Sequence, residues 1–206
     1  AVSPEEPYIY AVTDQYKAWL FDSRKEIDPA EEKSDSSSSL TENIIKNPFD
    51  MAWAEGFGGW AMVNGTGVLR VLEHADSASY KTLTNMNLSD GTVSSEEFTA
   101  LGTGAANVVL GTKSGKLLVA PNDISSMESG AVWTVAEAMN NSDNNEEILS
   151  VSEVSDELFF AVSKHKIYLL MKEEDGVWRF YDVANDKISL EETRFELPVS
   201  GMYTKV

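Results

Sequence analysis

Short runs of apolar residues alternate with short polar turns along most of this chain, a pattern that predicts β-strands joined by hairpins. Four times, an apolar strand is followed by a polar turn and then by a second apolar strand. The first strands of these copies are residues 8–12, 59–63, 107–110 and 158–162. The second strands are residues 17–22, 68–73, 116–119 and 166–170.

The four copies recur at nearly constant intervals. The second strands begin at Lys17, Val68, Lys116 and Lys166, which are separated by 51, 48 and 50 residues. A repeat of about 50 residues is typical of one blade of a β-propeller, a four-stranded antiparallel sheet. Gly65 and Gly115 supply the positive φ that tight hairpins need. The sequence therefore predicts an all-β fold, a four-bladed β-propeller that residues 1–206 form as a single domain.

Each blade needs two further strands. Candidates for an innermost strand are residues 51–54, 98–101 and 148–151, and candidates for an outer strand are residues 80–83, 132–135 and 177–181. The first copy has no innermost strand before it, so the segment Arg194–Val206 is our candidate to close the ring. Two alternatives remain: another all-β fold such as a sandwich or barrel, and a ring completed by another chain or by residues outside this sequence.

Two polar segments interrupt the repeat. Residues 28–43 are acidic and rich in serine, and residues 139–147 are rich in asparagine. Such segments cannot bury enough apolar surface to fold alone, so we expect solvated loops. The alternative for residues 28–43 is a phosphorylated or partner-binding segment.

The charge and the missing cysteines narrow the function. The chain carries 34 acidic and 16 basic residues, a net charge of −18, and no cysteine. A surface this acidic repels nucleic acids and anionic membranes, so we expect neither as a partner. Thiol catalysis and disulfides are excluded.

Several features favour secretion. The chain begins with Ala1 rather than methionine, as a processed protein does, and it has acceptor sequons for N-glycans at Asn64, Asn87 and Asn140. No apolar run is long enough to span a membrane. We therefore expect an extracellular, acidic glycoprotein.

Residues for catalysis or metal binding are sparse. The two histidines, His74 and His165, have no metal-ligand spacing, and no nucleophile elbow, phosphate loop or dinucleotide fingerprint is present. The glycine-rich residues 56–59 precede a strand, which indicates a bend. Candidate calcium ligands near Asp182 and near Asp143 lack a full alternating loop of oxygen ligands. We expect neither a cofactor nor an enzyme.

The tryptophans allow two interpretations. Trp19 and Trp178 lie in strands with alternating polar neighbours, and they fill the seams between blades or form platforms on which sugar rings stack.

Two hairpins resemble those of the fungal propeller lectins. Ala61-Met62-Val63 with Leu69-Arg70-Val71-Leu72, and Ala161-Val162 with Ile167-Tyr168-Leu169, are similar to that family's Ala-Val strand followed by a strand of the type Ile-Arg-Val-Tyr. The family's arginine matches Arg70. The fourth copy, with residues 177–182, is also similar to a blade of the hemopexin type, which occurs in rings of four. The first resemblance implies a lectin-like role.

The leading hypothesis is a secreted, non-catalytic binding module for a carbohydrate or a protein. Its expected ligand-binding residues are Trp19, Arg70 and Trp178. One alternative is a structural or assembly protein that pairs through propeller edges, for example as a homo-oligomer. Another is a hydrolase or lyase that acts on glycans.

Overall fold

The computed structural model describes residues 8–12, 18–22, 50–63, 69–72, 80–83, 87–91, 96–128, 132–139 and 145–184. For residues 8–12, 18–22, 69–72, 80–83, 127 and 128 it describes the backbone alone. The predictions for residues 28–43, for His74 and for the closing segment Arg194–Val206 concern residues outside this set.

Most described strands belong to three antiparallel meanders of four consecutive strands each. The first sheet consists of β3 (Asp50–Ala54), β4 (Gly59–Val63), β5 (Leu69–Leu72) and β6 (Tyr80–Leu83). The second consists of β8 (Phe98–Thr103), β9 (Asn107–Thr112), β10 (Leu117–Pro121) and β11 (Val132–Val135). The third consists of β13 (Ile148–Ser155), β14 (Leu158–Ser163), β15 (Ile167–Lys172) and β16 (Trp178–Asp182).

A separate hairpin precedes these sheets. Strands β1 (Tyr8–Val12) and β2 (Ala18–Asp22) pair with each other, and they correspond in the repeat to the second and third strands of a sheet. Two short helices lie in connections, a 3-10 turn η1 (Glu55–Phe57) after β3 and α2 (Ile124–Glu128) after β10. The expected bend at residues 56–59 therefore contains this 3-10 turn, and Gly58 ends it with φ of 64°.

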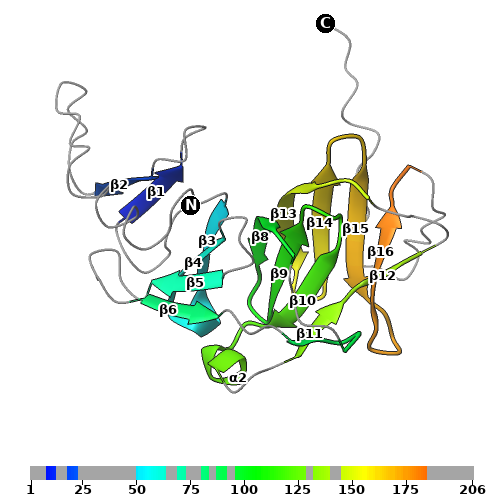
Figure 1. Cartoon of the computed structure of the whole chain (residues 1–206), viewed down its shortest axis with the longest axis horizontal. Coiled ribbons are helices and arrows are strands. Elements are labelled where there is room, and N and C mark those ends of the chain that lie inside the picture. The colour runs from blue at the N-terminus through cyan, green and yellow to red at the C-terminus, as the bar shows by residue number, and fades with distance from the viewer. Residues whose placement is uncertain are drawn as a thin grey trace, which may run out of the picture.

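The prediction of an all-β fold is confirmed, whereas the four-bladed ring remains a prediction. Figure 1 shows the three sheets in a row, with the β1–β2 hairpin at the end opposite the third sheet. The described part of the chain contains no helix long and apolar enough to cross a membrane.

Two-residue strands extend the second and third sheets in a way that the sequence did not indicate. Strand β7 (Asn87–Leu88) pairs in parallel with β11, and β12 (Glu137–Ala138) pairs in parallel with β16. Each connection therefore lies along the outer strand of the next sheet before it reaches that sheet's innermost strand. This pairing covers an edge that would otherwise be open to other strands. A strand of two residues is too short to show the apolar and polar alternation from which strands are predicted, so the sequence did not indicate β7 and β12.

Two apolar cores separate the three sheets. Val108, Leu110 and Leu118 of the second sheet pack against the first sheet, whereas Val109 and Leu117 pack against the third. Both faces of the second sheet are therefore buried, which explains the continuous apolar runs in β9 and β10.

Glycine permits close approach at the second of these interfaces. A Cβ atom at Gly111 would lie 2.4 Å from Cγ2 of Ile148, and one at Gly102 would lie 2.5 Å from Cγ1 of Val151. The second and third sheets thus contact each other through backbone at these positions.

Candidate functional site

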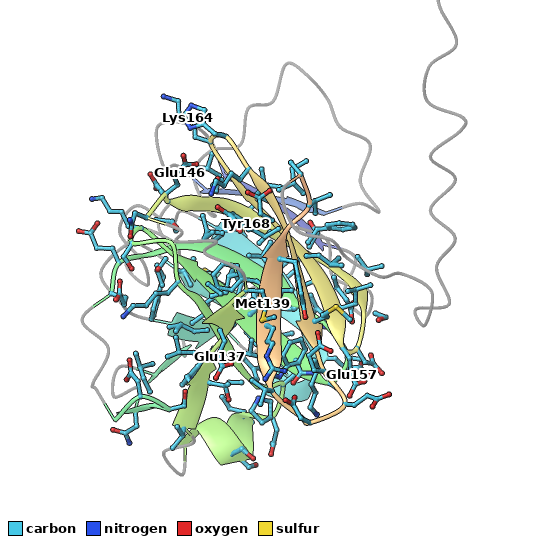
Figure 2. All side chains as sticks on the ribbon, turned by 90° about the vertical axis from the view of Figure 1, so that its right-hand side faces the viewer. Glu137, Met139, Glu146, Glu157, Lys164 and Tyr168 are labelled. Atoms are coloured by element: carbon cyan, nitrogen blue, oxygen red, sulfur yellow. The ribbon has the colours of Figure 1, made fainter. Side chains whose placement is uncertain are left out.

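The second and third sheets share an end at which polar side chains are held by repeated contacts. This hairpin end comprises the turn between β9 and β10, the turn between β14 and β15, and the residues just before β8 and β13. Lys164 and Glu146 lie together at this end of the third sheet, whereas Glu157 lies at the opposite end (Figure 2).

In the third sheet, Glu146 holds the β14–β15 turn. The hydroxyl of Ser163 donates to Oε2 of Glu146 at 2.7 Å, and the backbone N–H of His165 donates to the same oxygen at 3.2 Å. The other carboxylate oxygen lies 3.0 Å from Nδ1 of His165. These bonds lower the pKa of Glu146, with that from Ser163 contributing most.

In the second sheet, Glu96 holds the β9–β10 turn. The hydroxyl of Ser114 donates to Oε2 of Glu96 at 2.6 Å, and Nζ of Lys116 lies 2.9 Å from Oε1. Burial raises the pKa of Glu96, but the hydrogen bonds from Ser114 and Lys116 outweigh it, so the pKa lies below its usual value. In both sheets, a glutamate just before the innermost strand holds the turn of the hairpin that comes later in the chain. We call this arrangement a carboxylate clasp.

The turns themselves are closed in the same way. The N–H of Thr112 donates to the carbonyl oxygen of Lys116 at 3.1 Å, and the N–H of Lys116 donates to the hydroxyl oxygen of Thr112 at 2.8 Å. In the third sheet, the N–H of Ser163 donates to the carbonyl oxygen of Lys166 at 2.9 Å, and the N–H of Lys166 donates to the hydroxyl oxygen of Ser163 at 3.1 Å. Gly115 supplies the predicted positive φ, 89°.

The two clasps occupy equivalent positions of the repeat. Glu96 and Glu146 are 50 residues apart, as are Lys116 and Lys166. A device that recurs at the repeat period fixes both hairpins in one orientation, although Ser114 supplies the hydroxyl in one sheet and Ser163 in the other.

Cationic side chains project from the fixed turns. Lys113 pairs with Glu97, and Nζ of Lys166 lies 3.6 Å from the buried carboxylate of Asp182. Lys164 and His165 are exposed at the tip of the β14–β15 turn. The hairpin end thus combines basic groups with the carboxylates that pair with them, on a protein whose total charge is strongly negative.

The Ser163, Glu146 and His165 cluster is not arranged as a catalytic triad. In a triad the imidazole contacts the nucleophilic hydroxyl and removes its proton. Here the carboxylate lies between the hydroxyl and the imidazole, and its lowered pKa makes it a weak base. Within the described ranges no three potential metal-binding side chains of the His, Cys, Asp and Glu types lie close together. The arrangement positions loops.

The structure corrects the expectation for Trp178. Its side chain is 5% exposed and its ring centroid lies 6.1 Å from that of Phe159 in the core between the second and third sheets. The indole has no open face on which a sugar ring can stack, so Trp178 fills a seam. The reason is the neighbouring sheet, which covers one side of β16.

Trp19 and Arg70 remain predicted ligand-binding residues. Their backbones pair with Ala11 in the first case and with Met62 and Thr82 in the second. Trp19, Arg70 and Trp178 belong to three different sheets. The structure describes only the backbone of Trp19 and Arg70.

Asp182, one of the predicted calcium ligands, has other contacts. Its carboxylate is buried, accepts the N–H of Ala184 at 3.0 Å and pairs with Lys166. The clasps were missed because acidic pairs are common in this chain, yet a signal existed: Glu96-Glu97 and Glu146-Glu147 both directly precede an innermost strand.

The described sheets define an all-β protein built from four-stranded antiparallel meanders. No protein-family model matches the sequence, and none of the curated proteins matches it. Among solved structures, YCF48 from Cyanidioschyzon merolae is similar over 68% of this chain and 38% of its own, with 13% identity and a TM-score of 0.46. KlHsv2 with loop 6CD replaced by a Gly-Ser linker is similar over 67% of this chain and 44% of its own, with 9% identity and a TM-score of 0.41. The chain therefore spans less than half the length of either structure.

Proposed function

We propose that this chain is a non-catalytic binding module, a four-bladed propeller that binds a carbohydrate or a protein at the hairpin end. The observation that supports the proposal is the carboxylate clasp, which holds equivalent hairpins of two adjacent sheets. Side chains on loops that are already fixed lose less conformational entropy on binding. Lys164 is exposed at the tip of such a loop, so we assign it to ligand contact, whereas Lys113 and His165 contact Glu97 and Glu146.

The exposed ammonium group of Lys164 favours a ligand with an anionic group. Acidic saccharides and acidic segments of proteins share this chemistry, and both are compatible with a lysine donor.

A glycan array that includes uronic acid and sulfated sugars tests the carbohydrate class first. The variant Lys164→Glu should weaken binding at least about tenfold, since it replaces an attractive charge by a repulsive one. The matched control is Lys172→Glu, which makes the same change at the far end of strand β15. Equal losses in both variants would assign binding to net charge rather than to the hairpin end.

If no glycan binds, the carbohydrate class is excluded. A displayed library of extracellular proteins then tests the protein class with the same two variants. The proposal fails if neither screen yields a ligand whose affinity depends on Lys164.

We also propose that the protein acts outside the cell. Of the three sequons, Asn87 in β7 has an exposed side chain that a glycosyltransferase can reach. A glycosidase-sensitive mass shift on the natural protein would support secretion, and unmodified asparagines at all three sequons would remove this support.

A further inference from the structure

The face of the third sheet that points away from the second sheet has exposed apolar side chains near the hairpin end. These are Leu149 (53% exposed), Val162 (37%) and Ile167 (52%) in β13 to β15, and Val183 (45%) just after β16. Val162 and Ile167 are direct partners in the β14–β15 pairing, and the N–H of Val183 donates to the carbonyl of Ile167. We call this surface the outward face. Figure 1 shows the third sheet as the last of the row, with no described sheet beyond it.

The same positions of the second sheet are buried against the third sheet. Ile167 corresponds to Leu117, which is 0% exposed, and Phe160 corresponds to Val109, which is also 0% exposed. The correspondence follows from the strand pairings, since Leu117 opposes Gly111 as Ile167 opposes Val162.

A shared bulge extends the correspondence to the innermost strands. The pairing register shifts between Phe98 and Ala100 in β8 and between Ile148 and Ser150 in β13. The inserted residues are Thr99 and Leu149. Because the hydroxyl of Thr99 donates to the carbonyl of Ile148 at 2.6 Å, this position points to the next sheet. Leu149 therefore points where another sheet is expected.

The first sheet uses these positions in the same way. Ala61 and Val63 correspond to Phe160 and Val162, and both are 0% exposed in the core shared with the second sheet. In both the first and the second sheet, these outward positions thus pack against the next sheet. In the third sheet Val162 and Ile167 are exposed and Phe160 is half-buried.

The repeat places a suitable strand in the residues that follow β16. The innermost strands β8 and β13 begin 15 and 13 residues after the preceding outer strands end at Leu83 and Val135. The shorter step from Asp182 reaches Phe195. There, Phe195, Leu197 and Val199 form a short apolar stretch. Glu191-Glu192 lie upstream of it with two residues in between, whereas Glu96-Glu97 and Glu146-Glu147 directly precede β8 and β13.

Charge favours this segment over a second copy. A second copy would bring a net charge of −18 to an acidic surface, whereas residues 194–206 contain Arg194, Lys205 and a single acidic residue, Glu196. Like charges oppose association, and a weakly basic segment does not meet this cost.

We propose that residues 194–206 dock on the outward face as the innermost strand of a further sheet, with Phe195 against Val162. The position of Phe195 then corresponds to that of Ile148, whose side chain is the nearest neighbour of a Cβ atom at Gly111. The inference concerns a contact within the chain and does not depend on ligand binding at the hairpin end.

A disulfide experiment tests the contact, because the natural chain has no cysteine. The full-length variant Val162→Cys with Phe195→Cys should form a cross-link within one chain under mild oxidation. The control pair is Val132→Cys with Phe195→Cys, since Val132 is 53% exposed but belongs to the second sheet. Mass spectrometry after digestion identifies the linked peptides, and gel electrophoresis separates monomers from dimers.

Rapid cross-linking within the monomer in the first pair alone supports the proposal. Linked dimers as the main product would overturn it in favour of a second copy on the outward face. Equal cross-linking of both pairs, or none, would also overturn it.

A second measurement covers the case in which cysteine disturbs packing. In the full chain, Phe195→Asp should increase amide exchange in β14 and β15 by about tenfold where the segment covers them. Val132→Asp serves as the control and should leave these strands unchanged. Unchanged exchange in the Phe195→Asp variant would contradict the docking.

Discussion

The hydroxyl of Thr103 donates a hydrogen bond of 2.8 Å to the carbonyl oxygen of Trp53, the residue 50 positions earlier in the chain. This bond joins the innermost strands of the first and second sheets. Asn107 bonds similarly to the carbonyl of Asp156, 49 positions later, across the next interface. Hydrogen bonds between positions one repeat apart therefore help to fix the register of adjacent sheets, in addition to the apolar cores between them.

Asp50 makes the most consequential of these bonds. Its carboxylate accepts the N–H of Met51 and that of Leu101, both at 2.9 Å. We expect Asp50→Ala to lower the free energy of unfolding by about 2–3 kcal/mol, because it leaves the Leu101 N–H without its acceptor. Urea unfolding followed by circular dichroism measures the change. A loss below the error of the method would contradict a role in joining the sheets.

The same residue predicts a pH dependence. Burial raises the pKa of Asp50, and the two backbone hydrogen bonds only partly oppose this. A raised pKa in the folded state means that its contribution to stability is full below the unfolded-state pKa and falls as the pH rises through the folded-state pKa. The difference in stability between the natural protein and Asp50→Asn should therefore shrink as the pH is raised from acid to neutral. A constant difference across this range would refute the assignment.

The clasp in the third sheet should titrate in the opposite direction. Hydrogen bonds from Ser163 and His165 lower the pKa of Glu146, so its contribution is present above the unfolded-state pKa and is lost as the pH falls through the lowered value. Glu146→Gln should speed amide exchange in the β14–β15 turn near neutral pH and have less effect in acid. Glu157→Gln, at the opposite end of the sheet, provides the comparison and should leave this turn unchanged.

Gly111 should tolerate no larger side chain. A Cβ atom there would lie 2.4 Å from Cγ2 of Ile148 and 3.1 Å from Cβ of Ala100. Overpacking of this kind costs about 1–3 kcal/mol, so we expect Gly111→Ala to lower stability by that amount. In a double-mutant cycle, Ile148→Ala should relieve part of the strain. Strictly additive effects would show that the two positions do not touch.

Trp178 separates a structural role from a ligand-binding one. Since the indole is 5% exposed, Trp178→Ala should cost about 3–5 kcal/mol by creating a cavity beside Phe159. Chemical denaturation measures this loss. A fully stable variant that had lost only ligand affinity would restore the sugar-platform interpretation.

The strands were predictable because apolar alternation and hairpin turns are local signals. Strands β1, β4, β6 and β11 have the predicted boundaries. Alternation shows which residues share a face, but not which face a neighbouring sheet covers. That is why the sequence left both a seam and a sugar platform open for Trp178, which is buried in the core.

The carboxylate clasps could not be predicted from the sequence, because they depend on contacts between residues distant in the chain. Glu146 and Ser163 are 17 residues apart, and only the return of β14 toward the start of β13 brings them together. The recurrence of two glutamates before β8 and β13 was visible, but its meaning depended on where the hairpins lie.

The short parallel strands β7 and β12 have a mechanical consequence. Each belongs to the connection that leaves one sheet, yet its hydrogen bonds are made to the outer strand of the next. Tension on the connection loads both sheets at once, so neither can be peeled away without disturbing its neighbour. Under force, we expect the second and third sheets to yield in one event rather than as separate steps.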